Sequence, residues 1–256
     1  MPWFATYNKR FLTSLAIFTM AAGLRAADAP NVFLTRAEAA LQAAQKDFLG
    51  DRNNSTNALQ FARACFDVGE IATNATQRAD VSRRGIAACQ SLLVREPKSA
   101  PGHYCLALNL GELADAEAPS LAAYKLVHEI EQELLTAAQL DQLYDHAGAA
   151  RCLGLLYRDA PGWPLSIGSK HKAREWLARA AALAPDYPEN FINLAEAHLR
   201  WHQADEAAAT LKKLDALWPI ARTNLVGVAW EKSWSDWTRQ RMAARTECQR
   251  VFKRAP

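Results

Sequence analysis

Two prolines that each follow an Ala- and Leu-rich helical stretch, Pro185 and Pro219, are separated by 34 residues. This spacing constrains the fold most, because self-similarity at a fixed period of about 20 to 50 residues indicates stacked copies of one supersecondary unit. Past residue 30 the chain is dominated by residues that favour helices. The sequence therefore predicts an all-α protein built from repeated helical hairpins.

The residues within this spacing resemble the tetratricopeptide pattern, in which each unit is a pair of helices. The positions of this pattern are occupied in the later unit by Phe191, Leu194, Ala195, His198, Ala207 and Leu211. The earlier unit shows Leu153, Gly154, Tyr157, Ala173, Leu177 and Pro185. Small residues are needed because two helix axes approach to about 8–10 Å only where the side chain at their crossing is small. The clearest repeats are predicted over 145–187 and 188–221.

The pattern is weaker upstream and changes at the C-terminus. Residues 57–96 predict a hairpin that turns around 74–78, and residues 120–141 predict a long amphipathic helix, so about four hairpins form one array over 31–256. Residues 225–254 carry Trp230, Trp234 and Trp237 on one helical face. We expect a capping helix there, with a subunit interface as the alternative.

The turn of the earlier repeat, residues 158–172, is seven residues longer than in the plain pattern. Its prolines at 161 and 164 fix φ and its glycines at 162 and 168 allow tight bends, which predicts an ordered inserted loop. Trp163, next to Pro164, either packs against the helix ends or projects toward a ligand or partner.

The N-terminus has the features of an export signal, predicted over 1–26. Lys9 and Arg10 precede an apolar run at 11–24, and small residues follow. The run is shorter than the ~20 residues that span a bilayer, so an uncleaved membrane anchor is the less favoured alternative. The first cysteine is Cys65, which leaves no lipid-accepting cysteine at the cleavage point. We expect a soluble, periplasmic protein.

The chain has five cysteines, an odd number for an exported protein. Cys65 and Cys89 each lie twelve residues from Gln77, the centre of the first hairpin turn, so antiparallel helices place them at one level. A disulfide between them is a candidate, and it would stabilise the fold by about 3 kcal/mol.

Several functional classes are disfavoured. A formal charge of +3 over 256 residues provides no basic stripe, so nucleic acid is not an expected partner. The sequence contains no nucleophile elbow, phosphate loop or dinucleotide fingerprint, and we expect neither catalysis nor a cofactor. His198 and His202 are spaced to chelate a metal on one helix, but no third ligand is evident and no metal site is predicted.

The run APGWPLSIGSKHKAREWLARAAALAPDYPENFINLAEAHL, residues 160–199, resembles the T-component of tripartite ATP-independent periplasmic (TRAP) transporters. Those proteins carry a similar Pro-Gly-Trp loop, a K-A-x-x-x-L helix and a P-x-Y-x-E-N linker. The resemblance implies a tetratricopeptide-like fold, homo-oligomers such as trimers that enclose a pore, and docking to a periplasmic substrate-binding protein that captures small hydrophobic organic acids. The alternative is an envelope scaffold that binds another protein and has no small-molecule role.

Tetratricopeptide arrays line their concave face with the first helix of each repeat. This predicts one groove formed by Tyr104, Leu108, Arg151, Leu155, Arg158, Ile192, Asn193, Glu196 and Arg200. The arginines could pair with a carboxylate while the apolar residues cover the rest of the ligand. Alternatively, the arginines only balance neighbours such as Glu196. Trp163, at the edge of the groove, is the predicted contact for a partner or the pore mouth.

Overall fold

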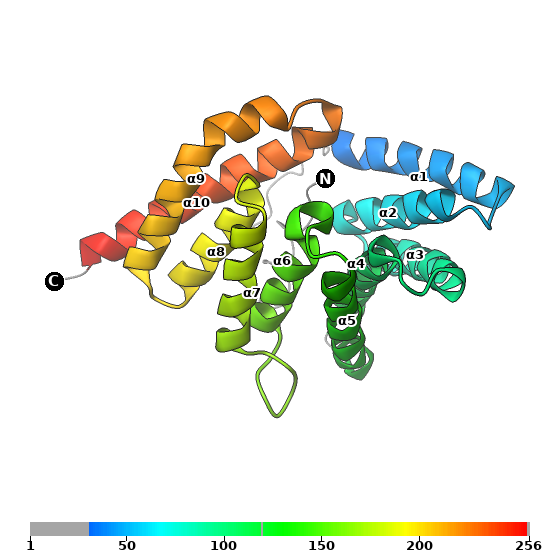
Figure 1. Ribbon diagram of the computed structural model, residues 1–256, viewed down its shortest axis with the longest axis horizontal. Coiled ribbons are helices and arrows are strands. Elements are labelled where there is room, and N and C mark those ends of the chain that lie inside the picture. The colour runs from blue at the N-terminus through cyan, green and yellow to red at the C-terminus, as the bar shows by residue number, and fades with distance from the viewer. Residues whose placement is uncertain (1–30, 119, 255–256) are drawn as a thin grey trace, which may run out of the picture. The chain divides into compact units, whose positions relative to one another are not determined.

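The computed structural model describes residues 31–118 and 120–254, and these residues are almost entirely helical (Figure 1). The all-α, tetratricopeptide-like prediction is confirmed, including the inserted loop and the C-terminal capping helix. The predicted signal peptide lies outside the described residues. Among the described helices, none has the length and apolar character to cross a membrane.

The described residues form two compact units, which divide between Glu133 and Leu134. The N-terminal unit contains α1 (Val32–Gly50), α2 (Ser55–Ile71), α3 (Ala75–Arg95), α4 (Ala100–Glu117) and the larger part of α5 (Leu121–Leu140). The C-terminal unit contains the end of α5, then α6 (Tyr144–Asp159), α7 (Lys170–Leu183), α8 (Pro188–Arg200), α9 (Ala204–Asn224), a 3-10 turn η2 (Val228–Trp230) and α10 (Glu231–Arg254).

In the N-terminal unit, short polar residues determine where the helices begin. The side chains of Asn31, Asn54, Asn74 and Ser99 each accept a hydrogen bond from a backbone N–H of the helix that follows. Such caps satisfy N–H groups that the first helical turn leaves unpaired. The turn predicted around 74–78 therefore lies at residues 72–74, just before α3.

The N-terminal unit also differs from the sequence prediction. Helix α1 was not assigned to any hairpin, yet it packs against α2, with Phe48 stacked on Phe61 at 5.1 Å between ring centroids. Cys65 and Cys89 are both buried and not joined by a disulfide. Burial raises the pKa of the Cys65 thiol to about 12, which makes this thiol a poor nucleophile. Their pairing in oxidised protein stays a prediction.

In the C-terminal unit, the helical pairs α6–α7 and α8–α9 lie where the two clearest repeats were predicted. The small residue at the first crossing is required: a Cβ atom on Gly154 would lie 2.6 Å from Leu177 Cγ and 2.9 Å from the Leu177 backbone nitrogen. Larger side chains at this position would push α6 away from α7.

The C-terminal end of the repeats differs from expectation at one proline. The sequence predicts that Pro219 follows a helical stretch, but Pro219 lies inside α9, which continues to Asn224. The tryptophan stripe of α10 packs within the chain. Trp237 is fully buried, and its ring contacts Tyr187 and Trp234 at 5.3 and 5.0 Å. The stripe thus covers the end of the array, as the capping prediction requires.

Candidate functional site

The first turn of α6 has an unusual backbone. Asp145, His146 and Ala147 all have positive φ, at 52°, 56° and 62°, with ψ between 37° and 49°. Left-handed conformation costs a residue with a side chain roughly 1–2 kcal/mol because Cβ approaches the following carbonyl oxygen. Three such residues in succession persist only where the surrounding structure holds them.

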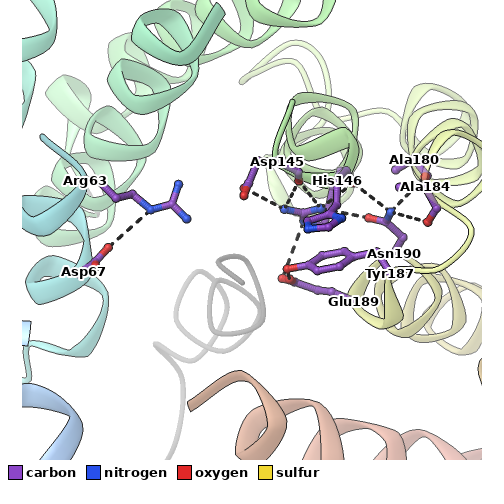
Figure 2. A network of polar contacts seen from close by, with 10 residues as sticks. Arg63, Asp67, Asp145, His146, Ala180, Ala184, Tyr187, Glu189 and Asn190 are labelled. Atoms are coloured by element: carbon purple, nitrogen blue, oxygen red, sulfur yellow. Dashed lines mark hydrogen bonds and ion pairs between the residues drawn. The ribbon is translucent and has the colours of Figure 1, made fainter. Parts of the chain in front are cut away.

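Two buried side chains hold the carbonyl groups of this left-handed turn (Figure 2). Arg151, one turn further along α6, donates to the carbonyl oxygens of Asp145 at 3.4 Å and His146 at 3.2 Å. Asn190 of α8 donates to the same His146 carbonyl at 3.1 Å and to those of Ala180 and Ala184 in the α7 segment. These bonds tie the turn to both neighbouring helices.

The charge of Arg151 is balanced inside this cluster. Its guanidinium is fully buried and lies 3.4 Å from Asp145 Oδ2 and 3.9 Å from Glu189 Oε1. The Tyr187 ring lies 5.1 Å from the guanidinium carbon, and the Tyr187 hydroxyl donates to Glu189 at 3.2 Å. A buried cation with two carboxylates and several acceptors around it is a structural clamp. We call these residues the Arg151 clamp: Asp145, His146, Arg151, Tyr187, Glu189 and Asn190.

His146 is the titratable group of the clamp. Its ring is stacked on Tyr187 at 4.2 Å between centroids, with Trp230 edge-on at 6.2 Å. Burial lowers the pKa of His146, because the charged imidazolium loses hydration among these aromatic rings. The ring is therefore neutral at pH 7.

The residues of the predicted groove are less accessible than expected. The structure buries seven of the nine, leaving Glu196 half-buried and Arg200 exposed. Tyr104 and Leu108 belong to the N-terminal unit and the other seven to the C-terminal unit. Binding of a ligand by these residues stays a prediction.

The three arginines of the predicted groove already have carboxylate partners. Arg151 is held in its clamp, and Arg158 pairs with Asp159 at 2.8 Å. Arg200 also pairs with Asp159. The interpretation that these arginines balance acids of the protein agrees with the structure, in which Asp145, Glu189 and Asp159 are such acids.

The inserted loop is ordered, as its prolines and glycines predicted. The backbone N–H of Gly168 donates to the Pro161 carbonyl at 2.8 Å, and that of Ser169 donates to the Tyr157 carbonyl at 2.9 Å. A Cβ atom on Gly168 would lie 2.0 Å from the Ala160 carbonyl oxygen, so only glycine permits this closure. The loop does not bury its tryptophan, because Trp163 is 89% exposed. The alternative that Trp163 packs against helix ends is wrong.

A hollow of about 690 Å³ lies between the α5–α6 turn and α7. It is lined by Leu135, Ala138, Gln139, Leu140, Asp141, Gln142, Leu143, Trp176 and Arg179. The Arg179 guanidinium lies 5.0 Å from the Trp176 ring centroid and donates to Gln142 Oε1 at 3.2 Å. No carboxylate of the described residues forms an ion pair with Arg179. The hollow therefore combines the apolar side chains of Leu135, Leu140 and Leu143 with polar ones, and its arginine forms no ion pair with a carboxylate of the described residues.

Sequence reasoning missed most of the clamp and all of the hollow. The signal for the clamp was the linker PDYPEN, residues 185–190, which was treated as a family motif and not as a set of contacts. Tyr187, Glu189 and Asn190 of this linker all face Arg151 or His146 (Figure 2). The hollow depends on how the α5–α6 turn meets α7, and the sequence contains no local sign of that meeting. Within the described residues, no cluster of three or more His, Cys, Asp or Glu side chains is suited to a metal ion.

Comparison with known proteins supports the fold. No protein-family model and no curated protein sequence matches the chain. Among solved structures, the chain is similar to a thermophilic tetratricopeptide protein, TTC0263 of Thermus thermophilus, with a TM-score of 0.61 and 19% identity over 83% of this chain and 92% of that one. It is also similar to MamA, with a TM-score of 0.51 and 19% identity over 74% of this chain and 92% of that one. The class that fold and comparisons define is a tetratricopeptide-like helical repeat protein.

Proposed function

We propose that the protein is a non-catalytic helical-repeat scaffold that binds another protein at the hollow beside the α5–α6 turn. The observation that carries this proposal is the presence of exposed leucines beside Arg179, whose guanidinium has no ion-pair partner among the described residues. Leu140 and Leu143 are exposed there, and exposed apolar side chains around a concave surface are typical of binding sites. A partner segment that presents an apolar side chain beside an acidic one would match this chemistry.

The arginine pairs favour a protein partner over a small organic acid. A carboxylate ligand that bound Arg151, Arg158 or Arg200 would have to displace Asp145, Glu189 or Asp159 from a buried or partly buried pair. Breaking such a pair leaves a charge without compensation and is strongly unfavourable. Arg179 has no such competitor and remains available to an incoming acidic group.

The more specific form of the proposal is a periplasmic accessory of TRAP-type transport. The motif of residues 160–199 supports it, and the PDYPEN part of that motif contributes Tyr187, Glu189 and Asn190 to the Arg151 clamp. In this form the protein is exported, associates as a trimer and docks to a periplasmic substrate-binding protein that carries a small hydrophobic organic acid. The alternative is a cell-envelope scaffold for a different protein.

Site-specific cross-linking in living cells tests the proposal. A photoreactive phenylalanine analogue at Leu143 should form a discrete protein adduct, and Arg179→Glu should strongly reduce its yield by opposing the partner's acidic group. The same analogue at Val94, which is 85% exposed on α3 of the other unit, is the matched control and should form none. An adduct with a substrate-binding protein supports the transport role, and a different protein supports the alternative. No adduct at Leu143, or one that Arg179→Glu leaves unchanged, contradicts binding at the hollow.

A further inference from the structure

The tip of the inserted loop displays two large apolar side chains to solvent. Trp163 is 89% exposed and Leu165 is 75% exposed, with Pro164 between them. Figure 1 shows the loop between α6 and α7 extending beyond the ends of these helices. Exposed Trp and Leu side chains at one projecting tip form a convex apolar surface, which differs from the concave hollow of the same unit.

The backbone of the loop is fixed, so this display is not a consequence of an unstructured segment. The Leu165 N–H donates to the Gly162 carbonyl at 3.1 Å, and Gly162 and Gly168 form a bridge at the base of the loop. The bonds from Gly168 and Ser169 described above close the base onto the end of α6. A fixed tip presents its side chains with little further loss of conformational entropy on binding.

Basic side chains follow the tip directly. Lys170, His171, Lys172 and Arg174 are all exposed on the first turns of α7, and the first turn contains no acidic residue. Positive charges at a helix N-terminus oppose the helix dipole, so this arrangement does not favour the helix itself. The neighbouring acid, Glu175, pairs with His171 at 3.4 Å. Basic side chains therefore outnumber acidic ones on the exposed first turns of α7, next to the apolar tip.

Aromatic faces support these cations. The ammonium of Lys170 and the guanidinium of Arg174 lie 5.6 and 5.7 Å from the Trp201 ring centroid, and the ammonium of Lys172 lies 4.7 Å from that of Tyr157. Such contacts keep the long side chains at this end of the unit, behind the apolar tip.

We propose that this loop docks the protein on the surface of an anionic lipid bilayer. Trp163 and Leu165 enter the headgroup region, and Lys170, Lys172 and Arg174 face the anionic headgroups. Trp is enriched at the boundary between headgroups and hydrocarbon, and basic residues close to the surface add electrostatic attraction. Lys is depleted at protein–protein interfaces, so the composition of tip and base favours a membrane. This proposal does not depend on which protein occupies the hollow.

Vesicle sedimentation tests the proposal on the protein as recovered from the cell envelope, with every variant prepared identically so that the N-terminal segment is common to all. Vesicles of equal parts phosphatidylglycerol and phosphatidylcholine should bind the protein, and pure phosphatidylcholine should bind it much more weakly. Trp163→Ala should weaken binding to the anionic vesicles about tenfold, consistent with the loss of one inserted aromatic side chain. Val94→Ala, at an exposed apolar position of the other unit, should leave binding unchanged.

Two further measurements separate the insertion of Trp163 into the bilayer from the electrostatic attraction of the basic side chains to the headgroups. A variant that combines Lys170→Gln, Lys172→Gln and Arg174→Gln should lose the preference for anionic vesicles. Its vesicle binding should also no longer depend on salt concentration. The fluorescence difference between wild type and Trp163→Phe should shift to shorter wavelength when vesicles are added, because Trp163 leaves water. Absence of vesicle binding would overturn the proposal. It would also be overturned if Trp163→Ala bound anionic vesicles as tightly as wild type, or if the fluorescence difference showed no shift when vesicles are added. A protein cross-link at position 163 without vesicle binding would also overturn it and assign the loop to a protein partner.

Discussion

The two ends of helix α6 differ in which side chains are buried and which are exposed. At its N-terminus, buried polar side chains hold a left-handed turn inside the protein, with Arg151 and Asn190 bonded to its carbonyl groups. At its C-terminus, backbone hydrogen bonds hold a loop whose apolar side chains lie outside. The residue types are thus reversed from the usual arrangement, in which apolar groups are buried and charged groups are exposed.

This reversal separates residues that maintain the structure from residues that are available for binding. The buried charges of the Arg151 clamp have internal partners, so changing them should alter stability. The exposed side chains of the loop contribute few contacts to the fold, so changing them should alter binding alone. Substitutions in the two regions should therefore differ in how much they lower the free energy of unfolding.

Replacing the central arginine should cause the greatest loss of stability. Arg151→Met removes the guanidinium that pairs with Asp145 and Glu189 and that donates to the carbonyls of the left-handed turn. Removing one partner of a buried ion pair costs about 3–5 kcal/mol, and we expect a loss of this size in urea unfolding. Arg239→Met removes a surface pair with Asp236 and should cost about 1 kcal/mol or less. Equal effects of the two substitutions would contradict the clamp.

Of the two glycines that form the bridge at the base of the inserted loop, Gly168 is required for the loop to close and Gly162 is not. Gly168→Ala should cost about 1–3 kcal/mol, because the new Cβ meets two carbonyl oxygens and the strain must be relieved by backbone shifts. The Cβ of Gly162→Ala would lie 3.8 Å from the Gly168 carbonyl oxygen, an ordinary contact distance, and this substitution should be almost neutral. Limited proteolysis should cut the loop faster in Gly168→Ala only; equal cleavage of both variants would show that the base is not held as described.

The clamp should also make stability depend on pH. The folded pKa of His146 is lowered by burial, so the unfolded chain binds a proton at higher pH than the folded protein. The contribution of His146 to the free energy of unfolding is therefore fully present above the ordinary histidine pKa of about 6.5. This contribution is lost as the pH falls from there toward the folded pKa. His146→Gln should flatten this dependence.

Part of the dependence of the unfolding free energy on pH should remain in His146→Gln, because burial also lowers the pKa of His198. Asp145, Arg151 and Asp186 act on the His146 charge, and their substitution would change the slope as well. Stability that is constant between pH 7 and 5 in wild type would contradict the buried position of His146.

Particular residues show how far the sequence determined the fold. The proline spacing and the small residues predicted the positions of α6 to α9. Small residues indicate these positions because two helices can cross closely only where a Gly or Ala lies between them. The prolines and glycines of the inserted loop likewise predicted its order. Helix α1 was missed because no repeat signature covers residues 32–50. The extension of α9 past Pro219 was missed because proline usually ends a helix.

The sites were less predictable than the fold. The groove was inferred from repeat positions, but burial depends on tertiary packing. Asn190, which contacts Arg151, and Asp159, which pairs with Arg200, lie 39 and 41 residues away in the chain. The exposure of Trp163 was left open by the sequence, because a rigid loop can present a side chain in either direction. The left-handed turn at 145–147 has no glycine or asparagine that would signal it.

The separation between clamp and loop is tested most directly by the unfolding free energy of Trp163→Ala in urea, compared with that of Trp237→Ala. Trp237 is fully buried under Tyr187 and Trp234, and its replacement should cost about 3–5 kcal/mol. Trp163→Ala should change the free energy by no more than about 0.5 kcal/mol, as for an ordinary surface position. A loss of several kcal/mol in Trp163→Ala would show that the loop is a structural clasp and would contradict its role in binding.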